Sequence, residues 1–217
     1  MITLYGYWRS TAAYRVRIAL NFKKIDYSQV SVHLVKDGGE QHKENYKRLN
    51  PQGLVPTLTD GDFTLSQSIA ILEYLDEKYP EIPLLPKDLK LKAIVRQLCQ
   101  VISADLHPLN NLRVLNYLTN DLSVSADEKT AWYHHWLQKG LDAYESVANQ
   151  GNYLGDYSIG GELTMADACL IPQLYNARRF DFCLDKYPRL SQIEKKCLSI
   201  PCVKVALPES QPDAAVE

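Results

Sequence analysis

Residues 7–20 read YWRSTAAYRVRIAL, and this stretch decides the fold. An alternating run over residues 2–7 leads into it as a predicted strand, and apolar residues over 12–22 then recur at helical spacing. The helix is apolar enough to be buried, yet it carries Arg15 and Arg17, and buried arginines need partners. The two side chains project about 200° apart on the helix. We therefore expect them to act as interface or interdomain pairing groups rather than as catalysts.

The composition limits the function classes. The chain has 217 residues, 46% of them apolar, and its 24 basic residues against 26 acidic ones give a net charge of −2 with no run of five like charges. This balance argues against a nucleic-acid or polybasic membrane partner. The five cysteines form no CxxC or zinc-type spacing, so we expect reduced thiols and no metal. No signal peptide and no run of 18 apolar residues is visible, which predicts a cytoplasmic protein.

The first 80 residues alternate between strand and helix patterns. A second strand is predicted over 27–35, two short strands over 55–59 and 63–65 flank the turn Asp60-Gly61-Asp62, and a helix begins at Ser66. The order is β-α-β, a polar segment, then β-β-α. This order is typical of a thioredoxin-like domain, which we place at residues 1–80.

The remainder of the chain is helical in pattern. Three prolines within residues 79–88 predict a linker over 81–88, and an all-helical domain follows over 89–217. Thr164 and Asp167 have the spacing of a capping box. The closing segment LPESQPDAAVE is expected to be a loose tail. The predicted helices cover residues 89–103, 112–118, 126–148, 165–175 and 190–198.

The N-terminus of the first helix is the first candidate site. Unpaired N–H groups and the helix dipole favour negative charge there, and redox proteins of this fold place CxxC at this point. This chain has Ser10 and Thr11 instead, so it brings no thiol of its own. The hydroxyls can donate to a thiolate supplied by another molecule; the alternative is that one of them only caps the helix.

Two further motifs extend this site. The Val55-Pro56 bond can be cis, which would present the backbone of Val55 to an extended peptide. Gln67 and Ser68 stand at a helix start, where a hydroxyl and free N–H groups suit a carboxylate. Taken alone, Pro56 reads as a turn residue and Ser68 as a cap. Together with the hydroxyl pair they suit an elongated cysteine-containing peptide such as glutathione.

These motifs carry a resemblance over nearly the whole chain. Residues 10–20, 36–39, 50–51, 55–57, 67–71, 107–109 and 164–167 are similar to the corresponding motifs of the zeta class of glutathione transferases. There is one departure, because the class commonly reads Ser-Ser-Cys where this chain has Ser10-Thr11-Ala12. The resemblance implies catalytic roles for Ser10 and Thr11 beside the glutathione sulfur. It further implies glutathione contacts from Gln41, His42, Val55, Gln67, Ser68, His107, Asn111 and Arg113, and substrate carboxylate contacts from Arg9 and Arg179.

The resemblance also implies a reaction. Class members of this type use glutathione to convert maleylacetoacetate to fumarylacetoacetate, a cis-trans isomerisation in tyrosine and phenylalanine catabolism, and they are homodimers. A thiolate adds reversibly to the double bond of this dicarboxylate, which frees it to rotate. Alternatives are isomerisation of maleylpyruvate, general glutathione transfer, dehalogenation of α-halo acids, and a glutathione-transferase-like binding module without turnover. Considered in isolation, Arg179 could form a salt bridge and His107 could be a packed residue.

Overall fold

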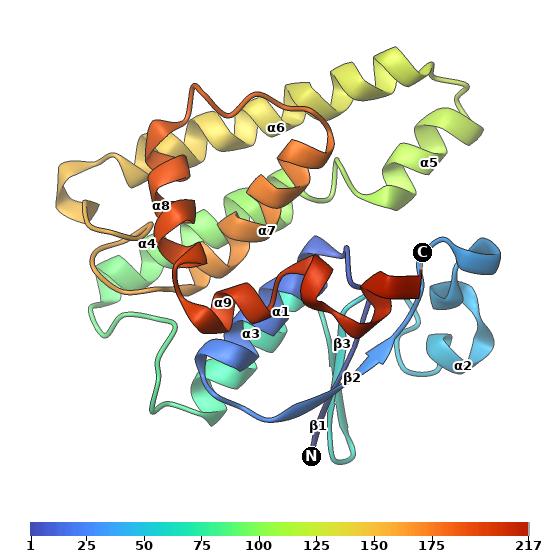
Figure 1. Ribbon diagram of the computed structural model, residues 1–217, viewed down its shortest axis with the longest axis horizontal. Coiled ribbons are helices and arrows are strands. Elements are labelled where there is room, and N and C mark those ends of the chain that lie inside the picture. The colour runs from blue at the N-terminus through green and yellow to red at the C-terminus, as the bar shows by residue number, and fades with distance from the viewer. Residues whose placement is uncertain (217) are drawn as a thin grey trace. The chain divides into compact units, whose positions relative to one another are not determined.

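The computed structural model describes residues 1–216 (Figure 1). The chain forms two compact units, each described by itself below. The first comprises Met1–Leu84 and the C-terminal segment from Leu198 onward, and the second is Leu85–Cys197. Within residues 1–216, no helix combines the length and apolar character that crossing a bilayer requires.

The first unit is built on a four-stranded mixed sheet with the order β2-β1-β3-β4. Strand β1 pairs parallel with β2 and antiparallel with β3, which pairs antiparallel with β4. Helices α1 and α3 pack side by side, and their apolar faces supply much of the core of this unit (Figure 1). The elements are β1 Ile2–Gly6, α1 Thr11–Phe22, β2 Tyr27–Ser31, α2 Glu44–Lys47, β3 Thr57–Asp60, β4 Phe63–Ser66 and α3 Ser68–Lys78.

The predicted hairpin is present. Asp60 pairs with Phe63, which leaves Gly61 and Asp62 as a two-residue loop. Gly61 has a φ of +60°, a conformation that a glycine adopts without a Cβ clash and that two-residue hairpin loops need.

The second unit is helical. Its helix α6 has the predicted bounds, whereas the first predicted helix is interrupted, because α4 stops at Gln100 and continues as wider π turns over Val101–Leu106. Thr164 and Asp167 form the predicted capping box, in which Asp167 accepts from the backbone N–H and the hydroxyl of Thr164 at 2.7 and 2.9 Å. The helices are α4 Leu89–Gln100, α5 Leu112–Asn120, α6 Ala126–Ala148, α7 Met165–Arg179 and α8 Pro188–Leu198.

The C-terminal segment differs from the sequence-based expectation. We expected it to belong to a helical domain over 89–217 and to end as a loose tail; instead it packs on the first unit, where α9, Pro201–Val205, lies against α1 (Figure 1). Two 3-10 helices follow at Pro208–Ser210 and Pro212–Val216, and Glu217 lies outside the described residues. The physical reason is polar anchoring, because Arg17 Nε donates to the carbonyl of Ala206 at 3.1 Å.

The predicted linker is likewise anchored at its start. Lys23 Nζ, fully buried, donates to the carboxylate of Asp76 at 2.8 Å and to the carbonyl of Ile82 at 2.6 Å. The N–H of Leu84 donates to the same carboxylate at 2.6 Å. The segment up to Leu84 therefore packs with the first unit.

Candidate functional site

One end of the sheet gathers most of the predicted site segments. Tyr5, Thr57 and Ser66 are paired across β1, β3 and β4, and Gly6 pairs with Ser31 of β2. The chain leaves β1, β2 and β4 at this end and enters β3 there. The register therefore places residues 7–11, 32–42, 55–56 and 67–68 at a single end of the sheet, although the first and the last of them are 61 positions apart in sequence.

Ser10 is the N-cap of α1. Its backbone is extended, with φ −67° and ψ 115°, and its Oγ accepts the Ala13 N–H at 3.2 Å. The backbone N–H of Ser10 closes a turn onto the Tyr7 carbonyl at 2.9 Å. Capping uses the hydroxyl only as an acceptor, so its proton can still be donated. The two alternatives from the sequence, cap and thiolate donor, are thus compatible in one side chain.

Thr11 follows as the first residue of α1 and is buried. Its N–H belongs to the first turn of the helix, where backbone donors have no intrahelical acceptor. No acidic residue occupies this first turn. The local field at the Ser10–Thr11 pair therefore favours an anion.

Arg9 is held by two aromatic residues that precede it. Its Nη2 donates to the hydroxyl of Tyr7 at 3.1 Å. Its guanidinium carbon lies 4.7 Å from the ring centre of Trp8 and 5.8 Å from that of Tyr7. Such cation–π contacts orient a guanidinium without neutralising it. Tyr7 and Trp8 were not identified from the sequence as site residues, although aromatic residues immediately before an arginine could have suggested this role.

The Val55–Pro56 bond is cis, as the sequence suggested. Leu54, which precedes Val55, is fixed by two hydrogen bonds. The Tyr46 hydroxyl and the Asn50 amide both donate to its carbonyl, at 2.7 and 2.8 Å. Strand β3 begins only at Thr57, two residues later than predicted. The backbone of Val55 therefore precedes the strand ladder.

Gln67 and Ser68 stand at the start of α3 as predicted. Gln67 has a φ of +72°, a conformation that is unfavourable for any residue with a Cβ and that concentrates at functional positions. Its Nε2 donates to Gln52 Oε1 at 2.8 Å. Ser68 is buried and its Oγ accepts from Arg15 Nη1 at 3.1 Å. Arg15 is thus a buried cation placed at the N-terminus of α3.

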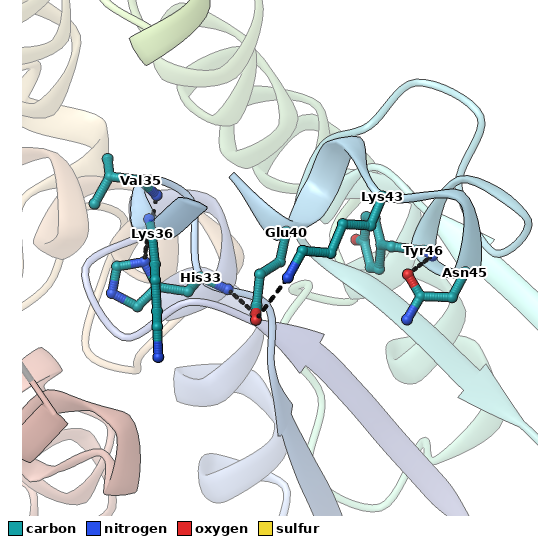
Figure 2. Close-up of polar contacts among 7 residues, drawn as sticks. All are labelled: His33, Val35, Lys36, Glu40, Lys43, Asn45 and Tyr46. Carbon is teal, nitrogen blue, oxygen red and sulfur yellow. Dashed lines mark hydrogen bonds and ion pairs between the residues drawn. The ribbon is translucent and has the colours of Figure 1, made fainter. Parts of the chain in front are cut away.

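The loop after β2 is organised by its own polar contacts (Figure 2). Glu40 accepts the His33 N–H at 2.8 Å, and its carboxylate lies 3.6 Å from Lys43 Nζ. The His33 N–H, with a smaller effect from Lys43, holds the pKa of Glu40 below its ordinary value. His33 Nδ1 in turn accepts the N–H groups of Lys36 and Val35 at 2.9 and 3.3 Å. These contacts fix the loop ahead of Gln41 and His42.

Gln41 and His42 have different environments. Gln41 is buried and its Nε2 donates to the Leu34 carbonyl at 3.2 Å, whereas His42 is exposed. Gly39 is required beside them, because it has a φ of +98° and a Cβ there would lie 2.5 Å from Gln41 Nε2. The Oε1 atom of Gln41 is buried and accepts no hydrogen bond from residues 1–216. A ligand amide N–H would satisfy this acceptor, so the chain's residues fit a peptide such as glutathione.

The other predicted glutathione contacts lie in the second unit. Asn111 is the N-cap of α5, where its Oδ1 accepts the Arg113 N–H at 3.1 Å. Its Nδ2 lies 3.4 Å from His107 Nε2. The Arg113 side chain is exposed. These three residues therefore cluster around the start of α5.

Arg179 ends α7, and its Nη1 donates to Asn176 Oδ1 at 2.9 Å. Asn176 Nδ2 donates to the Tyr133 hydroxyl at 2.6 Å, and burial raises the pKa of that hydroxyl. Arg178 forms the salt bridge of this helix end, donating to both carboxylate oxygens of Glu194. Among residues 1–216, no carboxylate lies within salt-bridge distance of Arg179, so its charge is available to a ligand. Asn176 and Tyr133 were not predicted from the sequence.

Comparisons with known proteins match both parts of the chain to glutathione S-transferases. Residues 1–77 match the model of the glutathione S-transferase N-terminal domain, and residues 110–207 match that of a C-terminal domain. A protein of Vibrio cholerae named probable maleylacetoacetate isomerase is 49% identical over 98% of both chains. The chain belongs to the zeta class of the glutathione S-transferases.

Solved structures of zeta-class relatives have the same fold. A bacterial maleyl pyruvate isomerase of this class, in its holo form, is 41% identical with a TM-score of 0.94, covering 97% of this chain and 99% of its own. A maleylacetoacetate isomerase of Methylobacterium extorquens AM1 with bound malonate and glutathione is 38% identical with a TM-score of 0.92, covering 97% and 98%. The predicted fold, a thioredoxin-like domain followed by a helical one, is confirmed for this zeta-class protein.

Proposed function

We propose that this zeta-class protein is a glutathione-dependent cis-trans isomerase that converts maleylacetoacetate to fumarylacetoacetate. The observation that carries the proposal is the arrangement at the N-terminus of α1. Ser10 is the N-cap, and its hydroxyl still has a proton to donate. It directly follows Arg9, whose guanidinium lies over the Trp8 ring. The chain is also 49% identical to a probable maleylacetoacetate isomerase. Such a site suits a thiolate and a carboxylate side by side.

Glutathione supplies the thiolate that adds to, and later leaves, the double bond of the substrate. Nine side chains and the backbone of Val55 would hold it: Gln41, His42, Gln67, Ser68, His107, Asn111, Arg113 and, at the sulfur, Ser10 and Thr11. The ordinary pKa of a free thiol is about 8.5, so a thiol is mostly protonated at neutral pH. Ser10 and the first-turn N–H groups of α1 stabilise the anion, which lowers the pKa of a thiol placed there.

Arg9 and Arg179 bind the two carboxylates of the substrate. A guanidinium is permanently charged and presents two parallel N–H donors to a carboxylate, which lysine cannot do. Tyr7 and Trp8 orient Arg9, and Asn176 orients Arg179. Malonate, a smaller dicarboxylate, is bound together with glutathione in the Methylobacterium extorquens relative, which supports this assignment.

Maleylpyruvate is the second candidate substrate. The maleyl pyruvate isomerase with a TM-score of 0.94 favours it, and both substrates are cis-enone dianions. General glutathione transfer and α-halo acid dehalogenation would use the same thiolate and are side activities in this proposal. The binding-module alternative is less favoured, because the hydroxyl pair, the cis proline and the Gln-Ser start of α3 are all present. We further propose a cytoplasmic homodimer.

A direct assay tests the function. Purified protein is mixed with maleylacetoacetate or with maleylpyruvate, with and without glutathione, and the trans product is measured by chromatography. We expect turnover only when glutathione is present, with the higher kcat/KM for maleylacetoacetate. Equal rates without glutathione, or no turnover of either substrate, would refute the isomerase proposal.

A further inference from the structure

We propose that Asp213, in the C-terminal segment, is a positioning residue for the carboxylate-binding Arg9. The two residues are far apart in sequence, and the connection between them runs through the backbone of Tyr7 and Trp8. The inference rests on the proposed role of Arg9 and deepens it.

Asp213 is buried and accepts three hydrogen bonds from residues in the N-terminal part of the first unit. Its Oδ2 accepts the backbone N–H of Trp8 at 3.0 Å and the Ser31 hydroxyl at 2.9 Å, and its Oδ1 accepts from Gln29 Nε2 at 3.4 Å. Figure 1 shows the red C-terminal segment passing α1 and reaching strand β2. The last turn of the chain is therefore bonded to β2 and to the segment that joins β1 to α1.

Arg17 holds the same two residues from their carbonyl side. Its Nη2 donates to the Trp8 carbonyl at 2.9 Å and its Nη1 lies 3.5 Å from the Tyr7 carbonyl. Its Nε donates to the Ala206 carbonyl of the C-terminal segment at 3.1 Å. The N–H and the C=O of Trp8 are thus both bound, one by Asp213 and the other by Arg17. This explains why a fully buried arginine lies within an apolar helix.

The side chains of Tyr7 and Trp8 connect these backbone hydrogen bonds to Arg9. The guanidinium of Arg9 lies over the Trp8 ring at 4.7 Å and bonds the Tyr7 hydroxyl. The backbone of Trp8 is bonded at its N–H and at its C=O, and that of Tyr7 at its C=O. These bonds restrict the movement of the two residues that carry the rings, so the guanidinium that rests on them is preorganised for a carboxylate. Loss of the Asp213 acceptor frees the Trp8 N–H and allows the rings, and with them Arg9, to move.

The test compares three variants of the full-length protein. Asp213→Ala removes the acceptor, Asp213→Asn keeps an oxygen that can accept the Trp8 N–H, and Gln211→Ala removes two hydrogen bonds that lie within the C-terminal segment, to the Val205 and Leu207 carbonyls. The readouts are the Kd of malonate by calorimetry with glutathione present, the kinetic constants for maleylacetoacetate, and hydrogen exchange of the Trp8 amide.

For Asp213→Ala we expect about a fivefold weaker Kd for malonate and a fivefold higher KM for maleylacetoacetate, with the KM for glutathione changed less than twofold. The Trp8 amide should exchange faster. Asp213→Asn should stay within about twofold of the wild type, and so should Gln211→Ala, which lowers stability without touching Trp8.

Unchanged malonate binding in Asp213→Ala would overturn the inference, as would an equal change in Gln211→Ala or a wild-type protein that binds no malonate. A wild-type protein that binds malonate but turns over neither substrate refutes the proposed function instead, and the effect of Asp213 on malonate binding then decides the inference separately.

Discussion

At the residue scale, Ser10 has two roles that one experiment can separate. Replacing Ser10 by Ala removes the cap of α1 and should lower the free energy of unfolding by about 1 kcal/mol in urea titrations. It should also raise the pH midpoint at which the glutathione thiol ionises in the complex, followed by the ultraviolet absorbance of the thiolate. The reason is that the Ser10 proton stabilises the anion.

Ser125→Ala is the matched control for Ser10. Ser125 caps α6 through a complete capping box with Glu128, so its removal should lower stability similarly and leave the thiolate midpoint unchanged. An unchanged midpoint in Ser10→Ala would assign the stabilisation to Thr11 or to the backbone donors instead.

Arg178 and Arg179 offer a second residue-scale prediction. Arg179→Ala should raise the KM for the dicarboxylate at least tenfold, on the order of 1.5 kcal/mol, and change the KM for glutathione little, because a charged donor to the substrate is lost. Steady-state kinetics with each substrate varied in turn measures both constants.

Arg178→Ala supplies the comparison, since this side chain is already bonded to Glu194. It should lower the melting temperature and leave both KM values near those of the wild type. If the two variants raise the dicarboxylate KM equally, the substrate role of Arg179 is wrong.

At the element scale, Asp167 determines how α7 begins. The carboxylate is fully buried and accepts from the N–H of Ser158 at 2.8 Å in addition to its two bonds from Thr164. Asp167→Ala leaves these buried donors without an acceptor and should lower the free energy of unfolding by about 3 kcal/mol. Asp167→Asn keeps one acceptor oxygen and should lower it less. Urea titrations of the two variants provide the measurement, and equal losses would contradict the hydrogen-bonding explanation.

The same carboxyl predicts a pH dependence. Burial raises its pKa above the ordinary value of 3.8, so between that value and the raised one the folded protein binds more protons than the unfolded chain. The contribution of Asp167 to stability therefore falls as pH rises through this window and is constant above it. The stability difference between the wild type and Asp167→Asn should shift in favour of the wild type as the solution is acidified. A difference that does not depend on pH would show that the hydrogen bonds offset burial.

Element bounds illustrate how far local pattern predicts structure. Periodicity located α1, α6 and the β3–β4 hairpin, because these elements carry their own caps and turn residues. It missed the break after Gln100, since the π turns of Val101–Leu106 contain no proline or glycine to mark them. It also missed the short helix α9. Five residues are too few to form a stable helix on their own, and packing against α1 supplies the missing stability.

At the scale of the whole molecule, the first unit contains residues from both the N-terminal and the C-terminal part of the chain.

The buried Lys23–Asp76 pair anchors the start of the linker to this unit. Lys23→Met should lower the free energy of unfolding by about 3 kcal/mol, because the carboxylate of Asp76 is left without its cation. Lys24→Met, next to it but exposed, should change it by less than about 0.5 kcal/mol. Chemical denaturation monitored by circular dichroism measures both, and similar values for the two variants would contradict the anchoring role.

The sequence by itself determined the class of fold, the hydroxyl pair in place of a cysteine at the start of α1, the position of the proline whose bond can be cis, and the capping box of α7. The class of fold follows from the order of strand and helix patterns along the first 80 residues, and each of the other features from a few adjacent residues, so local chemistry is sufficient to predict them. Only the tertiary structure decided the partners of Arg17 and the role of the C-terminal segment, because Arg17 bonds a carbonyl 189 residues away and Asp213 bonds a backbone N–H 205 residues away. Contacts at such separations depend on how the whole unit packs, and no periodicity or motif encodes them.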